Sequence, residues 1–124
     1  GRWAEAEALL ATMTGTAERP DGNGMMTREV GLPVARALLA FGRGRYAESV
    51  ELLRPVRLIA HRFGGSHAQR DVLSLTLVEA AIRGGQHRLA KALAAERMQL
   101  KPSSPFNWKL SLRTQAEQAA ALAA

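Results

Sequence analysis

Apolar and polar positions follow the same order in three separate stretches of the chain. The stretches are GRWAEAEALL at residues 1–10, GRYAESVELL at 44–53 and GQHRLAKALA at 85–94. In each, a ring side chain comes two places after the first Gly, a small residue five places after it, and an apolar pair closes the stretch. Such self-similarity is typical of stacked helix–turn–helix units, with Gly at the turn because it accepts a positive φ. We interpret each stretch as the start of the second helix of a unit.

The apolar spacing predicts six helices. Their approximate ranges are residues 2–13, 32–42, 45–63, 67–84, 86–99 and 105–122. A loop joins the first two, because TGTAERPDGNG at 14–24 is rich in Gly, Pro and polar residues. Pro55 falls inside the third helix, where it has no N–H and crowds the carbonyl of Glu51. We therefore expect a kink or a break at Pro55.

Composition also favours an all-α fold. Apolar residues make up 47% of the 124 residues and aromatic residues only 5%, whereas a sheet would be enriched in β-branched and aromatic side chains. The chain has no Cys, so it can hold no disulfide or thiolate metal site. No apolar run approaches the ~20 residues of a membrane span, and we expect a cytoplasmic protein. The aromatic residues at helical spacing are predicted core side chains: Trp3, Phe41, Tyr46 and Trp108.

The positive charge is concentrated in the middle of the chain. The net charge is +6, and residues 36–113 hold fourteen of the seventeen Lys and Arg but five of the eleven acidic residues. A basic region of this kind can attract nucleic acid, an acidic peptide or an anionic surface. It can equally keep an Ala- and Leu-rich helical protein in solution, which is the interpretation we favour.

The third stretch and the residues after it resemble the tetratricopeptide repeat. With Gly85 at the inter-helix turn, Ala90 and Pro102 fall at the small residue and the closing proline of the repeat. Pro105 then begins the next unit, and Trp108 takes the place of its first aromatic residue. The resemblance implies a right-handed array of helical hairpins, that is, an α-solenoid.

Four residues depart from the repeat pattern. Pro33 and Ser74 stand where the pattern has its first aromatic residue, and Ala94 and Arg97 replace a large and a small residue of the second helix. Seven residues more than the standard spacing also lie between Gly44 and Asp71. Seven residues are about two helical turns and return the buried stripe to nearly the same face, which favours an extended second helix.

We treat residues 1–124 as a single domain and as a fragment of a longer array. The first helix has no preceding partner within the chain, and the last has no following one. The predicted units are the second helix of a preceding repeat with its loop (1–29), a repeat with an extended second helix (30–70), a further repeat (71–104) and a terminal capping helix (105–124).

Three stretches resemble the tetratricopeptide repeat protein 38 family more specifically. They are ARALLAFGRGRYAESVELLRPVR at 35–57, IAHRFGGSHAQRDVL at 59–73 and ERMQLKPSSP at 96–105. They follow one another in matching order and cover roughly residues 31–105, with GGSHAQRD as the most specific run. The resemblance implies an all-helical repeat protein without an established activity.

A polar cluster surrounds the start of the fourth predicted helix. His67 and Asp71 lie four residues apart on one face, His61 lies upstream and Arg70 is adjacent. Such groups could hold zinc or form an acid–base pair, but the chain has no H-E-x-x-H motif. We expect no metal or cofactor, and favour an S-x-x-Q capping box at 66–69 with an ion pair between Arg70 and Asp71. An enzyme or enzyme accessory centred on His67, Arg70 and Asp71 is the alternative.

A second alternative is a basic RNA-binding surface. Nucleic-acid binding favours aromatic side chains interleaved with the basic ones for base stacking, and only Phe63 lies near the basic cluster. We therefore expect salt bridges between helices here and do not expect a nucleic-acid partner. The cluster comprises Arg54, Arg57, His61, Arg62 and Arg70.

The resemblance places a concave groove along the first helices of the units. The chaperone-type carboxylate clamp requires Lys and Asn there, and the first two units have neither. We therefore predict a mixed apolar groove with a basic end, suited to an amphipathic helix or an extended acidic peptide. The main hypothesis is a non-enzymatic protein-interaction scaffold; a second copy of the chain, as a homodimer, is another candidate occupant. The predicted contact residues are Val34, Leu38, Leu75, Glu79, Lys109 and Arg113.

Overall fold

The computed structural model describes residues 3–18, 21, 24, 27–59 and 67–123 of the chain. These residues form six α-helices and one short π-helix, and no strand occurs among them. The all-α prediction is confirmed. The elements are α1 (Trp3–Ala17), η1 (Thr27–Gly31), α3 (Leu32–Gly42), α4 (Tyr46–Ile59), α5 (His67–Arg83), α6 (His87–Leu100) and α7 (Pro105–Ala123).

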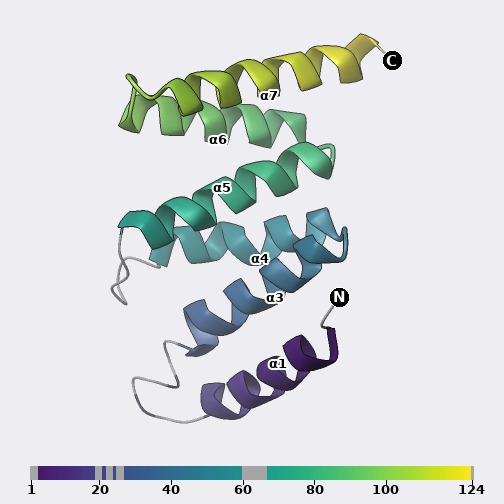
Figure 1. Cartoon of the computed structure of the whole chain (residues 1–124), viewed down its shortest axis with the longest axis vertical. Coiled ribbons are helices and arrows are strands. Elements are labelled where there is room, and N and C mark those ends of the chain that lie inside the picture. The colour runs from purple at the N-terminus through teal and green to yellow at the C-terminus, as the bar shows by residue number, and fades with distance from the viewer. Residues whose placement is uncertain (1–2, 19–20, 22–23, 25–26, 60–66, 124) are drawn as a thin grey trace.

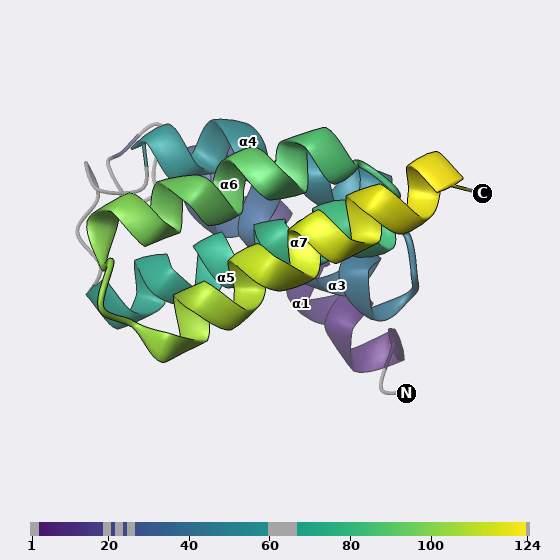
Figure 2. The ribbon, with the colours of Figure 1, turned by 90° about the horizontal axis from the view of Figure 1, so that it is seen from above.

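The helices pack as neighbours in chain order. Figure 1 shows them stacked along the longest axis of the molecule, from α1 at one end to α7 at the other. From above, α4 and α6 lie along one side of the stack and α5 and α7 along the other (Figure 2). α3 contacts α5 as well as α4, and α1 packs on η1 and α3. In the part of the chain that the structure describes, no helix has the length and apolar character needed to cross a membrane.

Two glycine turns join α3 to α4 and α5 to α6. Gly44 and Gly85 have φ values of 78° and 77°, a conformation that strains any residue with a Cβ. The N–H of Arg45 donates to the carbonyl of Ala40, and that of Gln86 to the carbonyl of Ala81, both at 2.8 Å. These six-to-one bonds are those of a Schellman motif. The repeated stretches at 44–53 and 85–94 therefore each begin with a left-handed glycine.

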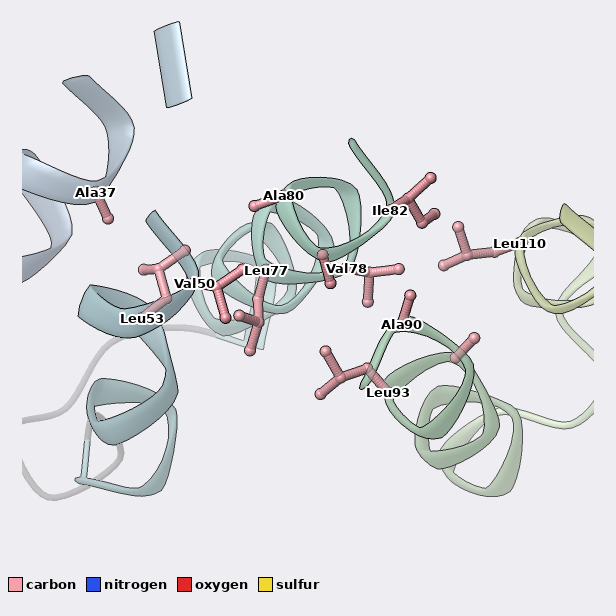
Figure 3. Close-up of a cluster of buried hydrophobic side chains, with 12 residues drawn as sticks. Ala37, Val50, Leu53, Leu77, Val78, Ala80, Ile82, Ala90, Leu93 and Leu110 are labelled. Carbon is pink, nitrogen blue, oxygen red and sulfur yellow. The ribbon is translucent and has the colours of Figure 1, made fainter. Parts of the chain in front are cut away.

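The core runs through the stack between the helices (Figure 3). Small residues at the repeated positions let the helices approach, since Ser49 and Ala90 are both buried. The hydroxyl of Ser49 donates to the carbonyl of Ala37 at 2.9 Å, which ties α4 to α3. The buried cluster comprises Ala37, Val50, Leu53, Leu77, Val78, Ala80, Ala81, Ile82, Ala90, Leu93, Ala94 and Leu110.

The predicted aromatic core is only partly correct. Phe41 and Tyr46 pack edge to face against the cluster, with ring centroids 5.4 Å apart. Trp108, however, is 55% exposed, and its indole N–H donates to the carbonyl of Pro102 at 2.9 Å. The face of α7 that turns inward carries Leu110 instead. The side chain of Trp3 is outside the described residues.

Helix α4 continues through Pro55 to Ile59, so the alternative of a break at Pro55 is wrong. Pro55 has no N–H to donate to the carbonyl of Glu51. Both residues are exposed, so this carbonyl can bond to solvent instead. Residues 60–63, the rest of the predicted long helix, lie outside the described residues. α1 reaches four residues further than predicted, and η1 was not predicted.

Candidate functional site

A polar cleft lies where α5 begins, α6 ends and α7 begins. These three helix ends come together at one edge of the stack (Figure 1). The cleft has a volume of about 280 Å³. We call it the Arg97 cleft; its lining residues are Arg70, Asp71, Ser74, Arg97, Leu100, Lys101 and Asn107.

Arg97 joins all three helices at the base of this cleft. Only 9% of the residue is exposed. Its Nε donates to Oδ1 of Asn107 at 3.1 Å, and its Nη1 donates to Oγ of Ser74 at 3.1 Å and lies 2.8 Å from Oδ1 of Asp71. The side-chain amide of Asn107 donates in return to the backbone carbonyl of Arg97 at 3.1 Å. Arg97 thus fixes the start of α7 and of α5 against the end of α6.

The arrangement offsets the cost of burying a guanidinium. An unpaired buried charge is strongly destabilising, whereas one that is paired and hydrogen-bonded is tolerated. Asp71 supplies the opposite charge, and Arg97 also lies in the last turn of α6, where the helix dipole favours a cation. Among the described residues, Nη2 of Arg97 has no hydrogen-bond partner. One amino group of a nearly buried guanidinium is therefore left for another acceptor.

The structure describes two side chains of the predicted polar cluster, those of Arg70 and Asp71. Arg70 and Asp71 both line the Arg97 cleft. The prediction paired Asp71 with Arg70, whereas the ion pair observed for its carboxylate is the one with Arg97. His61 lies outside the described residues, as do the side chain of His67 and the capping box at 66–69. Within the described part of the chain, no group of three His, Asp or Glu side chains could hold a metal ion.

Sequence reasoning missed Arg97, Ser74 and Asn107 as site residues. A signal was present, because Ser74 and Arg97 were two of the four departures from the repeat pattern. The structure places these two side chains in hydrogen-bond contact. This hydrogen bond joins α5 to α6.

The six predicted groove residues divide into three kinds. Val34 and Leu75 are half-buried and pack against the core cluster. Leu38 and Lys109 are exposed on α3 and α7. Glu79 and Arg113 form an ion pair that joins α5 to α7.

Glu79 is held between two arginines. Arg113 donates to both carboxylate oxygens, with Nη2 3.2 Å from Oε2, and Nε of Arg83 lies 3.3 Å from Oε2. The hydrogen bonds from Arg113, together with the charges of Arg113 and Arg83, lower the pKa of Glu79 although burial opposes the shift. The Arg83 guanidinium also lies over the Phe41 ring, 5.2 Å from its centroid. The charges that were predicted to recognise a partner are therefore largely neutralised within the molecule.

An apolar hollow lies between α1 and α3. Its volume is about 350 Å³. Leu9 is 59% exposed and Leu38 is 45% exposed, so both present aliphatic surface to solvent. We call it the α1–α3 hollow; it is lined by Ala6, Leu9, Leu10, Ala35, Leu38 and Leu39.

Three members of the predicted basic cluster have described side chains, Arg54, Arg57 and Arg70. Nη1 of Arg57 lies 3.1 Å from both carboxylate oxygens of Glu96, which links α4 to α6. This contact is a salt bridge between helices of the kind predicted for the cluster. Arg54 is exposed on α4, and His61 and Arg62 fall in the segment that the structure does not describe.

Two of the concave places on the described surface differ in chemistry: charged side chains line the Arg97 cleft, whereas aliphatic ones line the α1–α3 hollow. No protein-family model matches the chain, and no solved structure matches it. The function must therefore be inferred from the chemistry of these two places.

Proposed function

We propose that the protein is a non-enzymatic interaction scaffold of the tetratricopeptide type, which binds an amphipathic helix or an extended peptide. The observation that carries the proposal is the α1–α3 hollow, which is lined by aliphatic side chains and open to solvent at Leu9 and Leu38. Concave apolar surfaces of this kind accept the anchor residues of a helix or peptide.

The energetic reason is the exposed apolar area. Covering an aliphatic side chain completely contributes about 1.5–3 kcal/mol, and Leu9 and Leu38 are each about half exposed. Val72 on α5 and Phe106 on α7 are also more than half exposed. Each side chain that a partner covers contributes toward offsetting the loss of freedom on association.

The charges supply a secondary preference. Because Glu79 and Arg113 neutralise each other, apolar contacts dominate recognition in the middle of the predicted groove. Lys109 on α7 has no ion pair among the described residues and is exposed. An acidic residue at one end of the partner would therefore contact Lys109.

A peptide-display selection tests the proposal. Peptides selected on the intact chain are expected to carry apolar residues at helical spacing, and a Leu38→Glu substitution should weaken their binding about tenfold or more, because it places a charge in the apolar hollow. The matched control is Leu58→Glu, since Leu58 is 65% exposed but lies on α4 and does not line the α1–α3 hollow. Equal affinity of the wild type and the Leu38→Glu variant would refute the proposal.

Neither alternative has an equivalent observation in its favour. The carboxylate of Asp71 serves as counter-ion to Arg97 and is thus already engaged in holding α5 to α6. Arg57, in the predicted RNA-binding cluster, is paired with Glu96. The scaffold proposal is therefore favoured over the enzyme and the RNA-binding alternatives.

A further inference from the structure

We propose that the Arg97 cleft is a binding site for one carboxylate group carried on a small apolar body. The proposal concerns a different surface from the α1–α3 hollow and does not depend on the scaffold function.

The first step is the charge of the cleft. Arg97 and Lys101 line it together with the carboxylate of Asp71, while Arg70, the third cationic lining residue, is engaged in a further interaction within the molecule. The balance between Arg97, Lys101 and Asp71 is therefore positive, and the Arg97 side chain at the base is only one-tenth exposed. In such a partly desolvated place, a charge-assisted hydrogen bond to an anion is stronger than on the open surface.

The second step is the direction in which Arg97 can donate. Its Nε and Nη1 are engaged by Asn107, Ser74 and Asp71, which hold the guanidinium plane in place. Nη2 has no acceptor among the described residues. A donor that is already oriented loses little freedom when an acceptor arrives, so the site is pre-organised.

The third step selects a carboxylate over a phosphate. Asp71 already places one negative charge beside Arg97, and it would repel a dianion more strongly than a monoanion. The volume of about 280 Å³ falls at the small end of the range for ligand pockets and suits a group of amino-acid size. Leu100, which is strongly exposed, provides an apolar wall for the body of the ligand.

The ion pair between Asp71 and Arg97 provides the most direct test of the proposal. Asp71→Asn removes the counter-ion of Arg97 and should lower the melting temperature, since the buried cation is left without a carboxylate. N-acetyl-leucine at saturating concentration should restore about 3–6 °C to this variant, because its carboxylate replaces the missing charge. N-acetyl-leucinamide, which differs only in having no charge, should restore nothing.

The control variant is Glu96→Gln. It also removes a carboxylate from an inter-helix ion pair, that with Arg57, but the pair lies outside the Arg97 cleft. N-acetyl-leucine should not raise its melting temperature more than it raises that of the wild type. Equal rescue of the Asp71→Asn and Glu96→Gln variants, or rescue of Asp71→Asn by the amide, would overturn the proposal.

Titration of the wild-type chain measures the site without relying on a destabilised variant. N-acetyl-leucine should bind about threefold to tenfold more weakly to Lys101→Gln, whereas Lys91→Gln, on an exposed part of α6, should leave the affinity unchanged. Tighter binding of N-acetyl-Ala-Ala-Leu than of N-acetyl-leucine would identify a peptide C-terminus as the natural source; equal binding would identify a free small acid. Equal or tighter binding of inorganic phosphate, or no carboxylate binding at millimolar concentration, would refute the proposal.

Discussion

Gly85 has a positive φ, a backbone conformation that glycine adopts without the strain that a residue with a Cβ would incur. Its φ of 77° is matched by 78° at Gly44, and both residues lie in Schellman turns at the ends of α5 and α3. A Cβ at Gly85 would meet no atom within 4 Å. Any cost of substitution therefore comes from the backbone conformation and not from a steric clash.

We expect Gly85→Ala to lower the free energy of unfolding by about 1–2 kcal/mol, the cost of a left-handed conformation in a residue with a Cβ. Gly15 in α1 is the matched control, because it has equally open space and lies within a helix without a positive φ. Gly15→Ala should stabilise the protein by about 0.5–1 kcal/mol. Urea unfolding of the two variants checks both signs, and destabilisation by both would contradict the explanation.

At the scale of the elements, most helix boundaries after α1 could be predicted closely, whereas the side chains that face a neighbouring helix could be predicted only in part. The start of α7 at Pro105 and the end of α3 at Gly42 agree with the sequence-based ranges, because caps and turn residues act locally. Trp108 was misplaced because the hydrophobic pattern does not say which face of the last helix is covered. Arg97 was missed because its three partners come from two other helices.

The ion pair between α5 and α7 predicts a pH dependence of stability. Because its arginine partners lower the pKa of Glu79 below its ordinary value of 4.5, the stabilisation is complete above about pH 5 and is lost as the pH falls through the lowered pKa. Glu79→Gln should therefore reduce the free energy of unfolding by about 0.5–1 kcal/mol at pH 7. The difference from the wild type should shrink below about pH 4.

Urea titrations of both chains between pH 7 and pH 3 provide the measurement. Glu117→Gln serves as the control, because Glu117 also belongs to the helical stack but has no ion pair among the described residues. A constant difference between the wild type and Glu79→Gln over the whole pH range would show that the ionised carboxylate is not what joins the two helices.

At the scale of the whole molecule, the stability is unevenly distributed. The core cluster draws its residues from α3, α4, α5, α6 and α7, and none of its described members belongs to α1. α1 packs on α3 and η1, and an ion pair of 3.0 Å between Glu7 and Arg43 adds an exposed contact. In a stack of neighbours, each element depends on those beside it, so an end element with few buried residues opens first.

Hydrogen exchange followed by mass spectrometry should show this gradient. Amides in α5 are expected to exchange most slowly, since α5 contacts α3, α4 and α6 and contributes five residues to the buried cluster. Amides in α1 should exchange at least about tenfold faster, because opening α1 exposes little of the core. Equal protection of the two helices would indicate that the chain opens as one cooperative unit.

The exposed indole of Trp108 has a practical consequence for following the molecule in solution. The chain contains two tryptophans, and they stand on the first and last helices of the stack, α1 and α7. Replacing Trp3 with Phe leaves Trp108 as the single tryptophan, next to Asn107, which bonds to Arg97. Its emission would then give an optical signal for the detachment of α7.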